Sequence, residues 1–319
     1  MKFLLKIFII SLILLSCKNE NKSDVDVTNI EVDYAIERFE QAFYKATSES
    51  LIDVKNNFPL LFPIAVSDSV WLAKINNKDE QDLFNETQEI YSDFNEMKKQ
   101  FTSLFKHITH YNPTFRAPKV ITMLSNIDYE NRMIYADSIL LVSLDVYLGK
   151  QHEFYTDYPL YIKENNSKEH LIVDVANAII NTQVKPFNNR SFLSKIIAEG
   201  KKWHLLDSYL PLVSEKEKTG YSMKKLLWAK QNEEQVWKFF IEKELLYSTD
   251  TKLNKRFIEN APFSKFYTAQ DNQSPGKIGG YIGWKIVQSF MKQNDVSLQK
   301  LIAIDAQSLL DQSRYKPKK

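Results

Sequence analysis

The chain has 319 residues, of which 44% are hydrophobic, so it can bury a large core in one large domain or two modest ones. Its formal net charge is only +2, from 42 basic and 40 acidic residues. A nucleic-acid binder usually carries a clear basic surplus, so the composition argues against that class. The single cysteine, Cys17, excludes an intrachain disulfide scaffold and a cysteine-based zinc site.

The N-terminal segment MKFLLKIFIISLILLSC, residues 1–17, has the pattern of a secretory signal peptide. Two lysines precede an apolar run that is shorter than the roughly 20 residues of a transmembrane helix. The stretch Leu14-Leu15-Ser16-Cys17 resembles the lipobox of bacterial lipoproteins, in which the cysteine thiol carries the lipid. An ordinary cleaved signal peptide, or an N-terminal anchor with an incidental cysteine, is the alternative.

We therefore expect residues 1–16 to be a lipoprotein signal peptide and residues 17–29 to comprise the lipidated Cys17 and a flexible polar tether. Lys18, rather than an aspartate, follows the cysteine, which favours the outer membrane. The side of the membrane that carries the protein stays open. Without Lys2 and Lys6, the 42 basic residues become 40, equal to the 40 acidic ones.

Residues 30–319 show no linker, repeat or low-complexity segment, so we expect one domain. Helices are predicted, from their apolar periodicity, over residues 33–46 and 79–107. Strands with β-branched and aromatic residues are predicted next, over 118–125, 131–138 and 139–149. Further helices are predicted at residues 168–182, 222–248 and 297–311, the last two with Ser222 and Ser297 as N-caps. The expected fold is α+β, mainly helical, with a small β-sheet.

The helix at residues 168–182, KEHLIVDVANAIINT, is apolar around most of its circumference and should be buried. Its polar residues recur at helical spacing and form one stripe, made of His170, Asp174, Asn177 and Asn181. This stripe either meets solvent or lines a cleft. Glu199-Gly200 follows about one helix later, and by itself it reads as a helix end with Gly200 at the C′ position.

The other histidines do not indicate a metal site. His107 and His110 are three residues apart, which is not the i, i+4 spacing of a zincin helix, so we expect them at the surface or its boundary. The run His152 to Thr156 nearly spells H-E-x-x-H, but Thr156 replaces the second histidine and Pro159 follows. A proline there disfavours the continuous helix that the motif needs, so we expect a loop.

The stretch SPGKIGGYIGWKIV holds four of the seven glycines, at Gly276, Gly279, Gly280 and Gly283. Their spacing fits neither the Walker loop nor the dinucleotide fingerprint. It does fit one face of a helix entered through Ser274-Pro275, where four glycines are costly unless another backbone approaches closely. We expect a packing notch, with the 168–182 helix as its neighbour, and an open ligand groove is the alternative.

Several segments occur in an order that resembles the gliding-motility lipoprotein GldB family of Bacteroidota. They are the lipobox, LDVYLGKQHEFY with YPLYI, IIAEGKKWHLLDSYLP, APFSKFY and DNQSPGKIGGYIGWKIVQSFM. The resemblance spans nearly the whole chain after the signal peptide. It implies a cell-envelope protein that gliding motility requires and that is linked to type IX secretion.

That family in turn resembles predicted zinc peptidases, which carry H-E-x-x-H on one helix and an E-G dipeptide on a later one. Here the corresponding helix reads HLIVDVANAII, and Asp174 to Ala178 supply neither the histidine pair nor the catalytic glutamate. Glu199-Gly200 alone remains at the third-ligand position. The resemblance therefore implies a degenerate zincin-like scaffold without catalytic residues, metal or other cofactor, and a degenerate cleft at His170, Asp174, Asn177 and Glu199.

We therefore expect a non-catalytic lipoprotein that acts by binding or stabilising envelope proteins of the gliding and secretion machinery. It would contact the membrane through its N-terminal lipid and would not bind nucleic acid. A divergent zinc metallopeptidase that uses His170, Asp174 and Glu199 is one alternative. A glycan- or peptide-binding module that uses aromatic residues near Trp203, Trp237 and Trp284 is the other.

Overall fold

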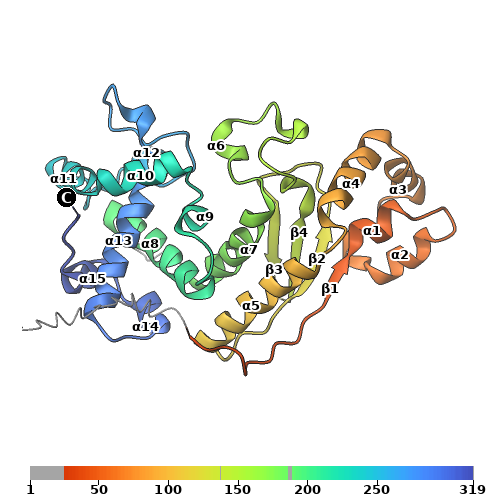
Figure 1. Cartoon of the computed structure of the whole chain (residues 1–319), viewed down its shortest axis with the longest axis horizontal. Helices are drawn as coiled ribbons and strands as arrows, with labels where there is room; N and C mark the ends of the chain where they lie inside the picture. The colour runs from red at the N-terminus through yellow and green to blue at the C-terminus, as the bar shows by residue number, and fades with distance from the viewer. Residues whose placement is uncertain (1–24, 137, 186–188, 319) are drawn as a thin grey trace, which may run out of the picture.

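The computed structural model describes residues 25–136, 138–185 and 189–318. Cys17, the signal peptide and most of the tether lie outside these residues. The described part contains fifteen α-helices and one four-stranded sheet, which confirms a mainly helical α+β fold. The sheet lies in the middle of an elongated molecule, with α1–α4 towards one end and α8–α15 towards the other (Figure 1). None of the described helices combines the length and apolar character needed to cross a membrane.

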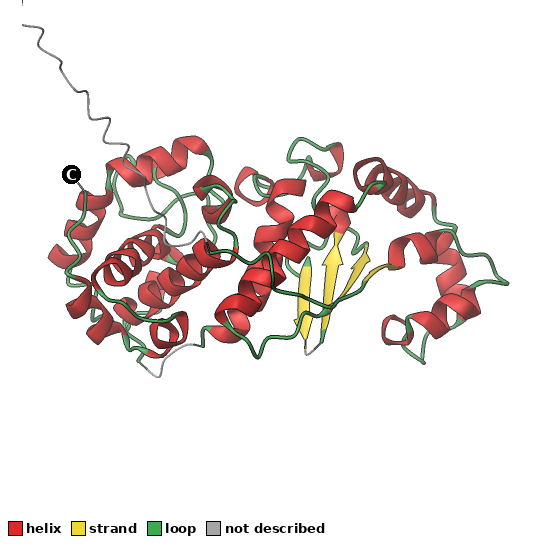
Figure 2. Ribbon diagram, turned by 60° about the horizontal axis from the view of Figure 1, so that its bottom comes forward, coloured by secondary structure: helices red, strands yellow, loops and turns green. Residues whose placement is uncertain are grey.

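The sheet has the strand order β1-β2-β4-β3 and stands out among the surrounding helices (Figure 2). Strands β1, β2 and β4 are parallel, and β3 is the antiparallel edge strand. Its strands are β1 Ile36–Arg38, β2 Lys119–Met123, β3 Met133–Ala136 and β4 Ile139–Ser143. Val120, Leu140 and Val142 of the central strands are completely buried, as their apolar side chains require.

The first predicted helix is wrong over its N-terminal part. Residues Ile36–Arg38 form β1, because they pair with Val120 to Thr122 of β2, and the helix begins only at Phe39. The long predicted helix 79–107 is also interrupted, since α4 ends at Tyr91 and α5 begins at Asn95. The Asp93 carboxylate accepts from the Asn95 backbone N–H at 2.8 Å, which competes with continuous helical bonding.

Five α-helices lie between β1 and β2 in the chain. Helices α1 Phe39–Tyr44, α2 Leu51–Asn57, α3 Asp68–Ile75 and α4 Lys78–Tyr91 come first, with α5 Asn95–Tyr111 leading into β2. The predicted strand 139–149 stops at Ser143, where the chain turns into a 3-10 helix at Leu144–Val146.

The C-terminal helices contain both predicted N-caps. Ser222 Oγ accepts from the Lys225 backbone N–H, and Ser297 Oγ accepts from that of Lys300. Both predicted helices are nevertheless split, at Asn232 and at Ile304–Asp305, where Asp305 caps a new helix. The helices are α6 Leu160–Lys163, α7 Lys168–Gln183, α8 Phe192–Tyr209, α9 Glu215–Thr219, α10 Met223–Gln231, α11 Glu233–Glu242, α12 Lys252–Phe257, α13 Ile278–Gln293, α14 Leu298–Ala303 and α15 Ala306–Ser313.

Helices α8 and α13 cross in backbone contact at two glycines. A Cβ atom added to Gly283 would lie 1.7 Å from the carbonyl oxygen of Ile196, and one added to Gly200 would lie 2.2 Å from the carbonyl carbon of Gly283. Gly200 lies in the middle of α8, which spans Phe192–Tyr209, so the prediction that it ends a helix is wrong. The neighbour of the glycine face is α8 rather than the expected 168–182 helix.

The glycine cluster serves packing at several points, although its first member is outside the helix. Gly276 precedes α13, and a Cβ atom there would lie 2.2 Å from the carbonyl oxygen of Ala261. A Cβ atom on Gly279 would lie 2.8 Å from the Phe257 carbonyl oxygen. At Gly280 the nearest atom is 3.4 Å away, which is an ordinary contact. The packing-notch interpretation therefore fits this chain.

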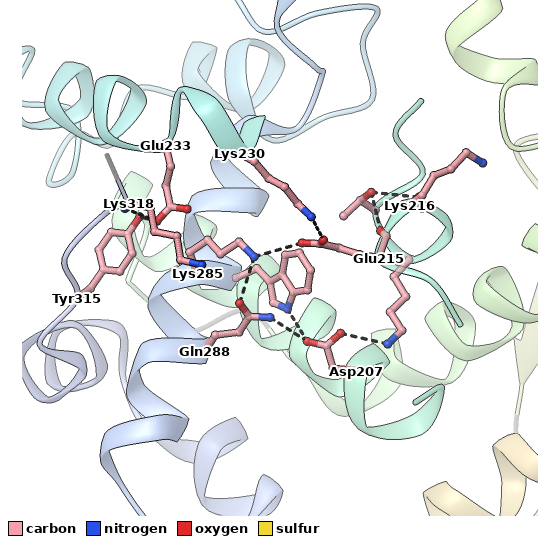
Figure 3. A network of polar contacts seen from close by, with 12 residues as sticks. Asp207, Glu215, Lys216, Lys230, Glu233, Lys285, Gln288, Tyr315 and Lys318 are labelled. Carbon is pink, nitrogen blue, oxygen red and sulfur yellow. Dashed lines mark hydrogen bonds and ion pairs between the residues drawn. The ribbon is translucent and has the colours of Figure 1, made fainter. Parts of the chain in front are cut away.

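Polar contacts tie α9 to this pair of helices and the C-terminal segment to α11 (Figure 3). Asp207 of α8 accepts from Trp284 Nε1 at 2.8 Å and from Gln288 Nε2 at 3.2 Å, both on α13. Glu215 of α9 pairs with Lys285 of α13 at 3.3 Å. Glu233 accepts from the Tyr315 hydroxyl at 3.0 Å and from the Lys318 backbone N–H at 3.2 Å.

The α8–α13 contact predicts the effect of two matched substitutions. Gly283→Ala should lower the free energy of unfolding by about 3 kcal/mol, because its methyl group must push the two helix backbones apart. Gly280→Ala should change stability by less than about 1 kcal/mol, since alanine's better helix propensity offsets the small adjustment. Urea unfolding of both variants measures the difference. Equal losses of stability in the two variants would show that the backbone contact does not limit packing.

Candidate functional site

A cavity of about 610 Å³ is the main candidate for a functional site. It is lined by α7 and α8, by the N-terminal ends of α10 and α13, and by parts of the loops before β3 and α13. This volume is within the roughly 300–1,000 Å³ of small-molecule sites. Its wall is rich in charged and amide side chains, which suits a polar ligand.

The polar stripe of α7 faces this cavity. His170, Asp174, Asn177 and Asn181 all line it, and Glu199 of α8 lines the same space. His170 is buried, whereas Asn181 is exposed. The structure thus brings together the α7 residues and Glu199, which lie on successive helices.

The Asp174 carboxylate is held by two donors. The Tyr147 hydroxyl donates to Oδ2 at 2.8 Å, and Nε of Arg132 lies 3.1 Å from the same oxygen. Burial, together with the nearby Asp174 charge, raises the pKa of Tyr147 well above its usual range, so the phenol stays protonated and can donate. The guanidinium of Arg132 compensates the negative charge of Asp174.

Arg132 is positioned by a constrained loop between β2 and β3. The Asp145 carboxylate is completely buried and accepts from the backbone N–H groups of Ser125 at 3.0 Å and Ile127 at 2.7 Å. Burial raises the pKa of Asp145 to about 6 in spite of these bonds. Ile127 has a φ of 60°, an uncommon value for a β-branched residue, which the contacts of Asp145 hold in place.

His170 lies between two carboxylates. Its Nε2 is 3.6 Å from Asp174 Oδ1, and its Nδ1 is 3.5 Å from Glu217 Oε2. The proximity of His170, and then of Lys216, lowers the pKa of Glu217 to about 2 against the opposing effect of partial burial. Glu217 therefore stays ionised across the physiological range.

Glu199 and Lys277 complete the charged wall. Glu199 Oε1 pairs with Lys202 Nζ at 2.8 Å on the same helix. Lys277 stands at the N-cap of α13 with a φ of 55°. Burial lowers the pKa of Lys277, and the carboxylates of Glu199 and Asp174 oppose that shift. Lys277 lines the cavity together with these two carboxylates.

The residue set does not fit a zinc ion. The two carboxylates that the metallopeptidase alternative uses as zinc ligands are Asp174 and Glu199. They already pair with Arg132 and Lys202. A nearby ammonium group and a guanidinium group disfavour a divalent cation, because they already supply positive charge. Within residues 25–136, 138–185 and 189–318, no three histidine, cysteine, aspartate or glutamate side chains are grouped suitably for a metal.

The remaining histidines lie outside the cavity. His107 is buried, and its Nδ1 lies 2.8 Å from the Ser103 carbonyl oxygen, which makes it a packed core residue rather than a surface one. His110 packs edge-on against Tyr111. The expected loop near His152 is a short 3-10 helix at Glu153–Tyr155, so it is not the continuous helix of a zincin motif.

The three tryptophans do not form an exposed stacking surface. Trp203 lines the cavity but is only 7% exposed, and Trp284 is 2% exposed. Trp237 packs edge-on against Tyr315. Their rings pack mainly in the core, so these tryptophans do not support a glycan-binding surface.

Several residues of the site were not predicted from the sequence, among them Arg132, Tyr147 and Lys277. The one signal in the sequence was Asp145, an acidic residue in the apolar run ILLVSLDVYL, which indicates a specific buried partner. Arg132 and Lys277 carried no such signal. Each is a charged residue in a loop, directly before β3 and α13 respectively, where charged residues are common.

The Arg132–Asp174 pair predicts a coupling that a double-mutant cycle can measure. Arg132→Gln alone should lower the free energy of unfolding by about 1–3 kcal/mol, because it leaves a largely buried carboxylate without its counter-charge. Adding Asp174→Asn should recover most of that loss. Urea unfolding of the two single variants and the double variant gives the coupling energy. Strictly additive effects would contradict a direct charge pairing.

Comparison with known protein families gives a match over nearly the whole chain. The family model described as gliding motility protein GldB matches residues 20–317, which include all the described helices and strands. No curated protein and no solved structure matches the chain. A match over nearly the whole length establishes membership, and the chain therefore belongs to the gliding motility protein GldB family.

Proposed function

We propose that this chain is a non-catalytic, lipid-anchored envelope protein that supports gliding by binding a partner in the cavity between α7, α8 and α13. Family membership connects it with gliding motility. The lipid anchor at Cys17, location in the outer membrane and a link to type IX secretion are further parts of the proposal. They rest on the lipobox and on the family resemblance.

The observation that carries the proposal is the charge pairing inside the cavity. A hydrolytic zinc site needs free ligand atoms and a base that activates bound water. Here Asp174 is engaged by Arg132 and Tyr147, and Glu199 is engaged by Lys202. The cavity keeps room for a ligand, so binding is favoured over hydrolysis.

The same geometry supports the idea of a degenerate peptidase scaffold. Asp174 on α7 and Glu199 on α8 line one space, and these are the helices that the resemblance assigns to zinc ligands. The basic side chains now supply the positive charge that a metal would supply in an active peptidase. The metallopeptidase alternative, with His170, Asp174 and Glu199 as ligands, would require two ion pairs and the Tyr147 hydrogen bond to be broken.

Filling the cavity should abolish gliding. Asn177→Trp places a large side chain on the half-buried polar stripe, so it should block a ligand without removing any charge pair. Gln293→Trp, at an exposed position on α13 outside the cavity, is the matched control and should glide normally. Colony spreading and single-cell tracking, with immunoblots to verify equal protein levels, provide the measurement. Normal gliding with Asn177→Trp would contradict a role for the cavity.

Metal analysis tests the non-catalytic assignment separately. The full chain, purified without chelators, should contain far less than one zinc per molecule, because the carboxylates are already paired. Mass spectrometry of the metal content, before and after incubation with excess zinc, is the measurement. One zinc per chain that disappears in Glu199→Gln would overturn the non-catalytic proposal.

A further inference from the structure

The cavity contains more positive than negative charge once its ion pairs are counted. Arg132 pairs with Asp174, and Lys202 pairs with Glu199. Lys218 pairs with Asp207 at 3.2 Å. Two further lysines line the cavity, Lys225 and Lys277, and within the described residues neither has a carboxylate at ion-pair distance.

These two lysines lie at the same end of the cavity. Lys225 Nζ donates to the carbonyl oxygens of Asn272 at 2.7 Å and Ser274 at 2.5 Å, in the segment that leads into α13. Lys277 caps α13 itself. The dipoles of carbonyl groups stabilise a lysine less than a full negative charge does. Burial accordingly lowers the pKa of both lysines.

Two helix N-termini strengthen the positive potential there. The start of α10, which has 9 residues, contributes Ser222 to the wall, and the start of α13, which has 16 residues, contributes Lys277. The N-terminus of a helix carries partial positive charge and favours anions. An anion at Lys277 would therefore compensate for the solvation that this lysine has lost on burial.

A second feature of the cavity is a buried histidine nitrogen without a hydrogen bond in the part of the chain that the structure describes. The His170 ring is 4% exposed and lines the cavity, and its Nδ1 makes no hydrogen bond within the described residues despite the nearby Glu217. A buried polar atom without a hydrogen bond is costly. The neighbouring wall offers the amides of Asn177 and Asn181, groups that pair well with peptide bonds.

We propose that the cavity binds an acidic peptide segment of a partner protein, with one carboxylate paired with Lys277. The inference rests on the proposed function and names the chemistry of the partner. A carboxylate suits the site better than a phosphate, because Asp174 and Glu199 in the same cavity repel a dianion more strongly. The planar fork of Arg132, which would recognise phosphate best, is already committed to Asp174.

Binding of a named probe tests the proposal. The full chain, solubilised in neutral detergent, is titrated into fluorescein-labelled Gly-Glu-Glu-Glu-amide and read by fluorescence anisotropy. We expect saturable binding, at least tenfold weaker binding of Gly-Gln-Gln-Gln-amide, and at least tenfold weaker binding of the acidic peptide to Lys277→Asn. Asparagine tolerates the left-handed backbone of this position, so this variant should fold. Lys224→Gln, on the exposed face of α10 outside the cavity, should bind like the unaltered chain.

Each other outcome has a defined meaning. Absence of saturable binding, equal affinity for the neutral peptide, or unchanged affinity in Lys277→Asn would overturn the proposal. Displacement of the peptide by inorganic phosphate at concentrations where acetate has no effect would assign the site to phosphate instead. A gliding defect in Asn177→Trp, combined with normal gliding in Lys277→Asn, would retain the cavity's function and reject the anionic partner.

Discussion

The close approach of α8 and α13 is the constraint on which the rest of the C-terminal half depends. At Gly200 and Gly283 the two backbones touch, so no side chain fits between them. This contact fixes the relative position of Glu199 on α8 and Lys277 at the start of α13. Both residues line the cavity, and a small displacement of one helix would separate their charges. A packing requirement thereby determines the electrostatics of the candidate site.

In the cavity, basic side chains pair with the acidic ones. The resemblance to zinc peptidases implies acidic and histidine ligands around a divalent cation, whereas here lysine and arginine supply the positive charge. Arg132 reaches Asp174 from the loop before β3, and Lys202 reaches Glu199 along α8. Each pair compensates the charge of a partly buried carboxylate. The pairs leave the volume of the cavity free, and binding is then the activity that the geometry supports best.

The polar network around Asp207, Glu215 and Glu233 has a different role from the cavity. Asp207 and Glu215 bind side chains of α13 and so fasten α9 to the α8–α13 pair, whereas Glu233 fastens the chain end to α11. Because α9 carries Glu217 and leads into Gly220 and Ser222, this network also supports one wall of the cavity. Stability and the candidate site are therefore coupled through α9.

The amino-acid sequence determined the class of the fold, the N-caps at Ser222 and Ser297, and the polar stripe on residues 168–182. These features follow from local periodicity and from side chains that bond to their own backbone. The sequence also pointed to close helix packing at the glycines, but it named the wrong neighbour. Only the tertiary structure decided that Ile36–Arg38 is a strand, since its partner, β2, lies far along the chain. Tertiary structure likewise paired Arg132 with Asp174 and placed Lys277 in the same cavity, because contacts between distant segments leave no periodic trace in the sequence.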